Sequence, residues 1–111
     1  MEELLCIYDT RQSFYGKAKV ETTKTTYELT QDLYSYDTLV AFIVWNFEKG
    51  TRVYKNLGKY SQTTTRHQKE FFKQNGLSDK QIKELFKNGV LEVEIWKLGT
   101  KWIKQRQLKC I

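Results

Sequence analysis

The residues whose types and spacing suggest a chemistry are basic, and they recur at helical spacing in the second half of the chain. Three of them stand at positions i, i+3 and i+7 of one segment, and three more repeat that spacing in the next segment. This spacing places side chains on one face of a helix, where cations can contact a row of phosphates. The two rows are Arg66, Lys69 and Lys73, and then Lys80, Lys83 and Lys87.

Positive charge is concentrated toward the C-terminal end. Residues 1–48 carry four basic and eight acidic side chains, whereas residues 49–111 carry fifteen basic and five acidic ones, which gives the chain a net charge of +6. A concentrated field of one sign attracts a partner of the opposite sign, although a lysine-rich surface can also be merely solvated. Further candidates for contact with an anionic partner lie near the end of the chain: Lys97, Lys101, Lys104 and Arg106.

A short turn that contains Gly76 separates the two helical segments, and this arrangement is similar to a helix-turn-helix motif. In such a motif the basic rows would contact phosphates, while Gln81 or Asn88 would reach base edges. Phe72 is bulky where the motif usually has a small residue, and the chain as a whole is rich in strands. We therefore favour a helical hairpin packed on a sheet, with a DNA-binding regulator as the alternative.

Aromatic residues stand beside lysines in the positive half, in Tyr54-Lys55, Lys59-Tyr60, Trp96-Lys97 and Lys101-Trp102. Exposed rings of this kind can stack on bases while the lysines neutralise phosphates. Most of the 16 aromatic residues must nevertheless lie in the core of so small a domain. We therefore expect core positions for most of these rings, and stacking on bases is the alternative.

His67 is the one histidine of the sequence. With Arg66, Lys69 and Tyr60 nearby, it could serve a small ribonuclease in which one group activates a 2′-hydroxyl and cations hold the phosphate. We favour the alternative that His67 packs over Phe71 at the edge of the core. The sequence has no phosphate-binding glycine loop, CxxC, HExxH or Ser/His/Asp arrangement, so we expect no catalytic residue, metal, cofactor or small-molecule substrate.

The sequence predicts a soluble protein of the cytoplasm with no membrane partner. Its first residues are acidic where a signal peptide is positive. Its longest apolar run, residues 39–47, is far shorter than the roughly 20 residues that cross a bilayer as a helix. We expect Cys6 to be a buried thiol and Cys110 an exposed one, rather than a disulfide.

A single domain over residues 1–111 is expected from the length. Alternating apolar residues and turn signals predict strands near 4–8, 17–23, 25–30, 39–45 and 51–57, with turns at 32–37 and 48–50. The continuous apolar run at 39–45 predicts a central strand that is covered on both faces.

Two helices are expected after these strands. The first is expected over residues 65–75, with a capping box formed by Thr65 and Gln68, and the second begins at Ser78, where Gln81 completes another box. Both segments end in Asn-Gly and an apolar residue, at 75–77 and 88–90, which predicts that glycine ends each helix and that the apolar residue folds back onto it.

Alternation returns over residues 91–96, and Gly99-Thr100 predicts a two-residue turn before a last strand at 102–108. The order of elements predicts an α+β fold: a mostly antiparallel sheet with a central two-helix segment and a C-terminal β-hairpin.

Two stretches match the patterns SY-x-T-x-VA and YS-x-TT-x-RH, at residues 35–41 and 60–67. Over roughly residues 5–76 the chain resembles a family of small phage-encoded domains of unknown function that carry these patterns. The resemblance implies no catalytic role. It implies instead that the chain is one of the small phage proteins that act against host defences in the cytoplasm of the infected cell. Anti-CRISPR proteins are among these.

Within this resemblance, the residues around the second pattern have two possible roles. They could organise a turn, with Arg66 bracing the strands, or the start of the helix could form an anion site for a phosphate. Together, these observations predict a non-enzymatic, phage-type binding protein. Its basic half, residues 49–111, would engage nucleic acid or a nucleoprotein such as a Cas-type effector.

Overall fold

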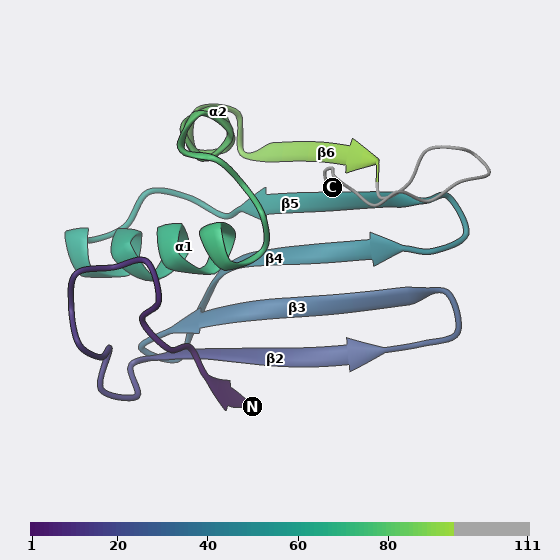
Figure 1. The fold of residues 1–111 in the computed structure, drawn as a ribbon. Helices are drawn as coiled ribbons and strands as arrows, with labels where there is room; N and C mark the ends of the chain where they lie inside the picture. The colour runs from purple at the N-terminus through teal and green to yellow at the C-terminus, as the bar shows by residue number, and fades with distance from the viewer. Residues whose placement is uncertain (95–111) are drawn as a thin grey trace.

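The structure is a computed structural model, and it describes residues 1–94 of the chain. The elements follow in the order β1 (Glu2–Glu3), β2 (Ala18–Lys24), β3 (Glu28–Ser35), β4 (Thr38–Asn46), β5 (Thr51–Asn56), α1 (Gln62–Gln74), α2 (Asp79–Asn88) and β6 (Val90–Glu94). The six described strands pair in chain order as one antiparallel sheet, and the helices are inserted between β5 and β6 (Figure 1). The predicted α+β fold is confirmed, while the turn and last strand of the expected C-terminal hairpin lie outside the described residues.

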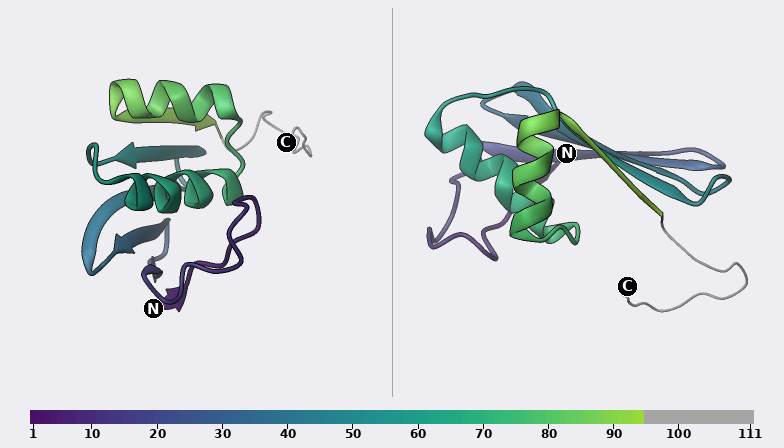
Figure 2. Two further views of the ribbon diagram at one scale, coloured as in Figure 1. Left: turned by 90° about the vertical axis from the view of Figure 1, so that its left-hand side faces the viewer. Right: turned by 90° about the horizontal axis from the view of Figure 1, so that it is seen from above.

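Both helices and the N-terminal loop lie on one face of the sheet, toward one end of the strands (Figure 2). The core forms between this face and the helices. Neither described helix is long and apolar enough to cross a membrane. The buried apolar side chains at the centre of the core are Leu33, Ala41, Ile43 and Tyr54 from the sheet, and Phe71, Phe72, Ile82 and Leu85 from the helices.

The apolar run at 39–45 forms the middle of β4, which pairs with β3 on one side and β5 on the other, as predicted. Within residues 1–94, however, only one face of β4 is covered. Ala41 and Ile43 are buried under the helices, whereas Phe42 and Val44 on the opposite face keep part of their surface exposed. The expected cover on both faces is therefore not found among residues 1–94, because the two helices there lie on the same side of the sheet.

The turn expected over residues 32–37 is in fact two residues long. Ser35 pairs with Thr38, and Tyr36 and Asp37 between them have φ angles of 52° and 70°. Positive φ at both central residues is the geometry of a type I′ hairpin turn, whose twist matches that of the flanking strands. Residues 32–35 form strand because both β2 and β4 pair with them, and Leu33 is buried in the core.

The first strand was expected over Leu4 to Tyr8, but β1 ends at Glu3. The backbone N–H groups of Ile7, Tyr8 and Asp9 donate to the carboxylate of Glu70 on α1, at 2.8–3.1 Å. These three amides are therefore not available to pair with a neighbouring strand, and the chain forms a loop that is bound to the helix.

Cys6 lies in this loop as a half-buried free thiol. Burial raises its pKa, and the nearby carboxylates of Asp9 and Glu70 raise it further. The thiol is therefore protonated near neutral pH, and Cys110 lies outside the described residues.

Helix α1 begins at Gln62, earlier than expected, because Ser61 caps it. The Ser61 hydroxyl accepts a hydrogen bond from the Thr64 amide at 3.2 Å. The predicted box of Thr65 and Gln68 is wrong, because the Gln68 side chain is buried and donates to the Asn56 side chain at 2.7 Å. A side chain committed to the sheet cannot reach back to the start of its own helix.

Helix α2 has the predicted capping box. The Ser78 hydroxyl accepts from the Gln81 amide at 3.2 Å, and the Gln81 side chain accepts from the Ser78 amide at 2.9 Å. The two bonds satisfy two amides that would otherwise lack a partner within the helix.

Both helices end at a glycine in the left-handed region, as predicted, with φ of 93° at Gly76 and 84° at Gly89. After α1, the Leu77 amide donates to the Phe72 carbonyl at 3.2 Å, and Leu77 is buried against the core. Val90 follows α2 but starts β6 and is exposed, so the expected fold-back is confirmed only at the first helix.

The Glu70 contacts lead to a stability prediction. In Glu70→Gln, an amide NH₂ replaces one of the two oxygens that face the loop amides, so a buried donor meets other donors. We expect the free energy of unfolding to fall by about 1–3 kcal/mol. Urea denaturation followed by circular dichroism measures this change. Glu84→Gln, on the exposed face of α2, is the matched control, and equal effects of the two substitutions would contradict the anchoring role.

Candidate functional site

The basic row of α1 lines a groove. Arg66, Lys69 and Lys73 form one wall of a depression of about 350 Å³, and residues 8–10 of the N-terminal loop form the other. The helical spacing predicted from the sequence is confirmed for this row. The groove arises because the loop is fixed beside the helix.

Two contacts fix the loop in that position. Glu70 is 2% exposed and accepts from three consecutive loop amides, as described above. Asp9 then accepts a charged hydrogen bond from Arg66 at 3.0 Å. Arg66 therefore braces the N-terminal loop rather than the strands, and part of its charge is already neutralised.

A second groove, of about 370 Å³, runs between the two helices. Lys69 and Lys73 line it from α1, and Lys83 lines it from α2, with Phe86 at its apolar side. Lys73 also pairs with Asp79 at 3.1 Å, although Asp79 is 86% exposed. Because Lys69 and Lys73 line both grooves, the two depressions form one continuous basic surface.

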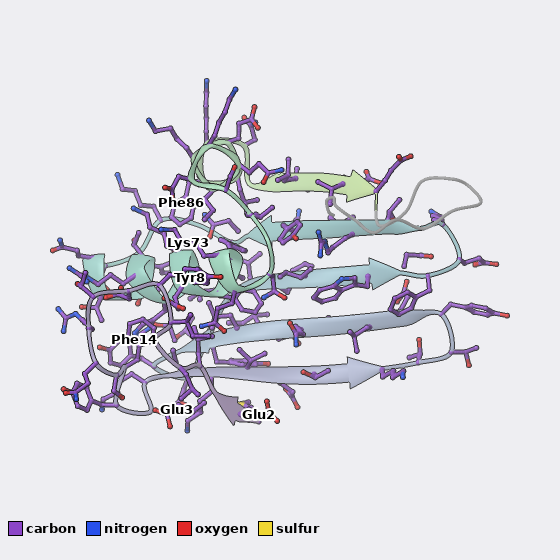
Figure 3. All side chains as sticks on the ribbon, viewed as in Figure 1. Glu2, Glu3, Tyr8, Phe14, Lys73 and Phe86 are labelled. Carbon is purple, nitrogen blue, oxygen red and sulfur yellow. The ribbon has the colours of Figure 1, made fainter. Side chains whose placement is uncertain are left out.

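A third groove, of about 500 Å³, continues beyond Phe86 to Lys59 and Lys87. Figure 3 shows Tyr8, Lys73 and Phe86, which mark this path from the loop across α1 to α2. We call the whole area the helical surface, and it comprises Tyr8, Lys59, Arg66, Lys69, Lys73, Lys80, Lys83, Phe86 and Lys87.

The second basic row also lies where the sequence predicts it. Lys80, Lys83 and Lys87 are exposed on α2, while Ile82 and Leu85 on its other face are buried in the core. The helices form a hairpin that rests on the sheet (Figure 2), as expected. Residues 1–94 carry 14 basic and 13 acidic side chains, so most of the excess charge belongs to residues 95–111. Four candidates lie outside the described residues: Lys97, Lys101, Lys104 and Arg106.

The proposed base-reading role of Gln81 is not supported by its position. Its side-chain oxygen accepts from the Ser78 amide in the capping box, so this atom is already used. Asn88 is exposed at the end of α2 and lines the third groove.

His67 is enclosed in the core. It is 1% exposed, its Nδ1 atom lies 2.8 Å from the Ser35 hydroxyl, and Ser35 also hydrogen-bonds to Thr64 at 2.9 Å. Its ring meets Phe14 edge-on at a centroid distance of 4.5 Å, so Phe14 is a ring partner that the sequence did not reveal. Burial lowers the pKa of His67. A neutral, enclosed imidazole supports the structural role over the ribonuclease alternative.

The aromatic residues divide between the core and the surface. Tyr54 is fully buried and donates to the Asn75 carbonyl at 2.6 Å, and burial raises its pKa to about 12, so its ring cannot stack on a base. Tyr60 is 38% exposed, and Trp96 and Trp102 lie outside the described residues.

Tyr8 is a site residue that sequence reasoning missed. It is 57% exposed at the wall of the first groove, opposite the basic row of α1. The sequence placed it in a strand, and no local signal marks its true position, because that position depends on Glu70 more than sixty residues away.

A family profile described as a family of unknown function, DUF8033, matches residues 3–88. The chain belongs to this family. The DUF8033 match includes the N-terminal loop, both helices and both basic rows, so the helical surface lies within it. No curated protein and no solved structure matches the chain. The DUF8033 description gives no function, so phage origin and anti-CRISPR activity stay predictions.

The burial of His67 leads to a prediction on pH. Because its pKa is lower in the folded state than the ordinary 6.5, the unfolded chain binds the proton more readily. The contribution of neutral His67 to the free energy of unfolding is therefore fully present above the pKa of the histidine in the unfolded chain. This contribution is lost as the pH falls below that pKa. Between about pH 7.5 and 5.5, we expect the wild-type chain to lose more stability than His67→Gln. Urea titrations at each pH test this, and parallel losses in both proteins would contradict it.

Proposed function

We propose that this chain is a non-enzymatic binding protein that engages nucleic acid through the helical surface. The observation that carries the proposal is the groove in which Arg66, Lys69 and Lys73 face a fixed loop. The sugar-phosphate backbone of a nucleic acid strand would lie along this groove and continue between the helices. Lysine and arginine contacts to phosphate supply most of the affinity in complexes of this kind.

The Lys73–Asp79 pair presents little obstacle to a phosphate, because its side chains are 34% and 86% exposed. Exposed pairs of this type contribute about 0–1 kcal/mol, so exchanging this carboxylate for a phosphate costs little. In the Arg66–Asp9 pair the Asp9 side chain is only 10% exposed, so this pair stays formed and holds the loop. Lys69 has no ion-pair partner among residues 1–94 and lies where the first two grooves meet.

The exposed ring of Tyr8 favours binding of single-stranded nucleic acid over binding of a duplex. Its ring stands exposed at the groove, and the bond from its amide to Glu70 fixes the backbone beneath it. An unpaired base can stack on such a ring while the adjoining phosphates lie near Lys69 and Lys73. In a duplex the base faces are covered by neighbouring bases.

A nucleoprotein offers the same phosphates where its nucleic acid is accessible. The specific form of the proposal, a phage-type inhibitor of a guide-RNA effector in the host cytoplasm, rests on the resemblance to phage-encoded domains. The helical surface supports the coarser form, which is contact with a phosphate backbone.

The first test is the salt dependence of binding. Fluorescence anisotropy of a labelled single-stranded RNA or DNA measures affinity at rising KCl concentration. We expect the logarithm of the association constant to fall with the logarithm of salt concentration, by roughly 0.7 for each phosphate contacted. Lys69→Gln should weaken binding and reduce the slope by about that amount. Lys24→Gln, at the end of β2 that lies farthest along the strand from the helices (Figure 1), is the matched control. Affinity that does not change with salt would overturn the proposal.

The second test concerns Tyr8. We expect Tyr8→Ala to weaken single-strand binding by about 1–3 kcal/mol and to leave duplex binding nearly unchanged, because only unpaired bases stack. Tyr8→Phe keeps the ring and should bind as the wild-type chain does. Equal losses for Ala and Phe, measured by the same titration, would show that the ring does not stack.

A further inference from the structure

The face of the sheet opposite the helices is not covered by any described element (Figure 2). The residues on this face are identified from the contacts that their neighbours in the same strand make on the other face. Tyr54 and Asn56 bond to the helices, at Asn75 and Gln68, so Val53 and Lys55 of the same strand point the other way. Ser35 likewise bonds to His67, which sets the alternation in β3. We call this surface the open face, and it includes Glu21, Asp32, Tyr34, Phe42, Val44, Val53 and Lys55.

Charges on the open face are arranged in a row that crosses the strands. Glu21 pairs with Asp32, Asp32 with Phe42, and Phe42 with Lys55. The row is therefore acidic on one side of β4, basic on the other, and aromatic at the centre. The adjoining row has Val44 and Val53 side by side, with Thr30 on the β3 side and Glu92 on the β6 side. The apolar centre is thus flanked by opposite charges in the row of Phe42.

Among residues 1–94 the two carboxylates of this row form no ion pair, although Lys19 lies two residues from Glu21 on the same face. Glu21 and Asp32 stand directly opposite each other, and like charges in that position destabilise a sheet. Burial raises the pKa of Asp32, and the charge of Glu21 raises it further. Within residues 1–94 no ion pair joins Asp32 or Lys55 to an opposite charge. Each of these side chains would gain from a partner above the sheet.

We propose that two copies of this chain pack through their open faces, about a two-fold axis that runs along β4. This symmetry places β3 of one copy over β5 of the other, so that each Asp32 meets the Lys55 of the second copy. Phe42 of one copy meets Phe42 of the other at the axis. Two residues further along β4, Val44 meets Val44 in the same way. The open face of one copy is therefore complementary, in its charges and its apolar centre, to the open face of the second copy.

The charge pattern also selects this axis over the other possible one. A two-fold axis across the strands would stack β3 on β3 and bring Asp32 onto Asp32. Juxtaposed like charges cost several kcal/mol at an interface, whereas the axis along β4 turns the same residues into two ion pairs.

The area of the open face sets the strength of the dimer. Five strands about 4.8 Å apart, with about six residues each at roughly 3.3 Å per residue, give a footprint of roughly 500 Å² per copy. This area is at the small end for specific interfaces, so the dimer forms in a concentration-dependent equilibrium. Because the helices lie on the other side of each sheet, the two helical surfaces would face outward and remain accessible.

Charge reversal tests the proposal by sedimentation equilibrium of the full chain at low salt. In Asp32→Lys, two lysines meet at each contact, and in Lys55→Glu, two carboxylates meet. Each variant alone should dimerise on the order of a hundredfold more weakly than the wild-type chain. An equimolar mixture of the two should form heterodimers, because every contact then pairs opposite charges. The double variant should dimerise with itself for the same reason.

Lys24→Glu is the matched control, because it makes the same change of charge in a strand but pairs with Leu29 on the face that carries the helices. It should dimerise as the wild-type chain does. Circular dichroism verifies the fold of each protein. If a single charge variant fails to fold, Phe42→Arg takes its place and should be monomeric, because it sets two cations at the axis.

Three results would overturn the proposal. The first is a wild-type chain that stays monomeric at millimolar concentration, which would leave the open face to a different partner or to solvent. The second is a folded charge variant, or Phe42→Arg, that dimerises with wild-type affinity. The third is a mixture of the two charge variants that associates no better than either alone. None of these results bears on nucleic-acid binding by the helical surface.

Discussion

The carboxylate of Glu70 holds the N-terminal loop against α1, and the shape of the helical surface depends on this contact. Three consecutive amides donate to it, and hydrogen bonds to a charged acceptor are stronger than neutral ones. A buried carboxylate without such donors would destabilise the fold, so the loop and the helix need each other. With the loop in place, Asp9 reaches Arg66, Tyr8 is presented beside the lysines, and a flat helix face becomes a groove.

The order of the elements separates two surfaces of different chemistry. The strands pair in chain order, and both helices enter between β5 and β6 on the same side of the sheet (Figure 1). That side carries the basic residues that suit a phosphate backbone. The other side keeps Phe42 between Asp32 and Lys55, which suits a second copy of the chain. Association through one surface therefore leaves the other surface free.

Sequence reasoning succeeded where a structure is decided by residues close together in the chain. The capping box of Ser78 and Gln81 and the glycine that ends α1 depend on neighbours within one helical turn. The spacing of the basic rows is equally local. It failed where distant residues decide. Ile7 and Tyr8 were expected at the end of a strand but bond to Glu70, and residues 32–35 were expected in a turn but pair with two strands. Tyr8 was missed for the same reason.

A titration of the ¹⁵N-labelled chain with a single-stranded oligonucleotide, followed by NMR, tests the central claim most directly, because it reports on every amide at once. We predict that the largest shift changes fall on residues 8–10 of the loop and on the outward side of the helices around Lys69, Lys73 and Lys83. We also predict that the amides around Phe42 on the open face change little. Changes confined to the open face, or no change at saturating oligonucleotide, would contradict the assignment of the helical surface.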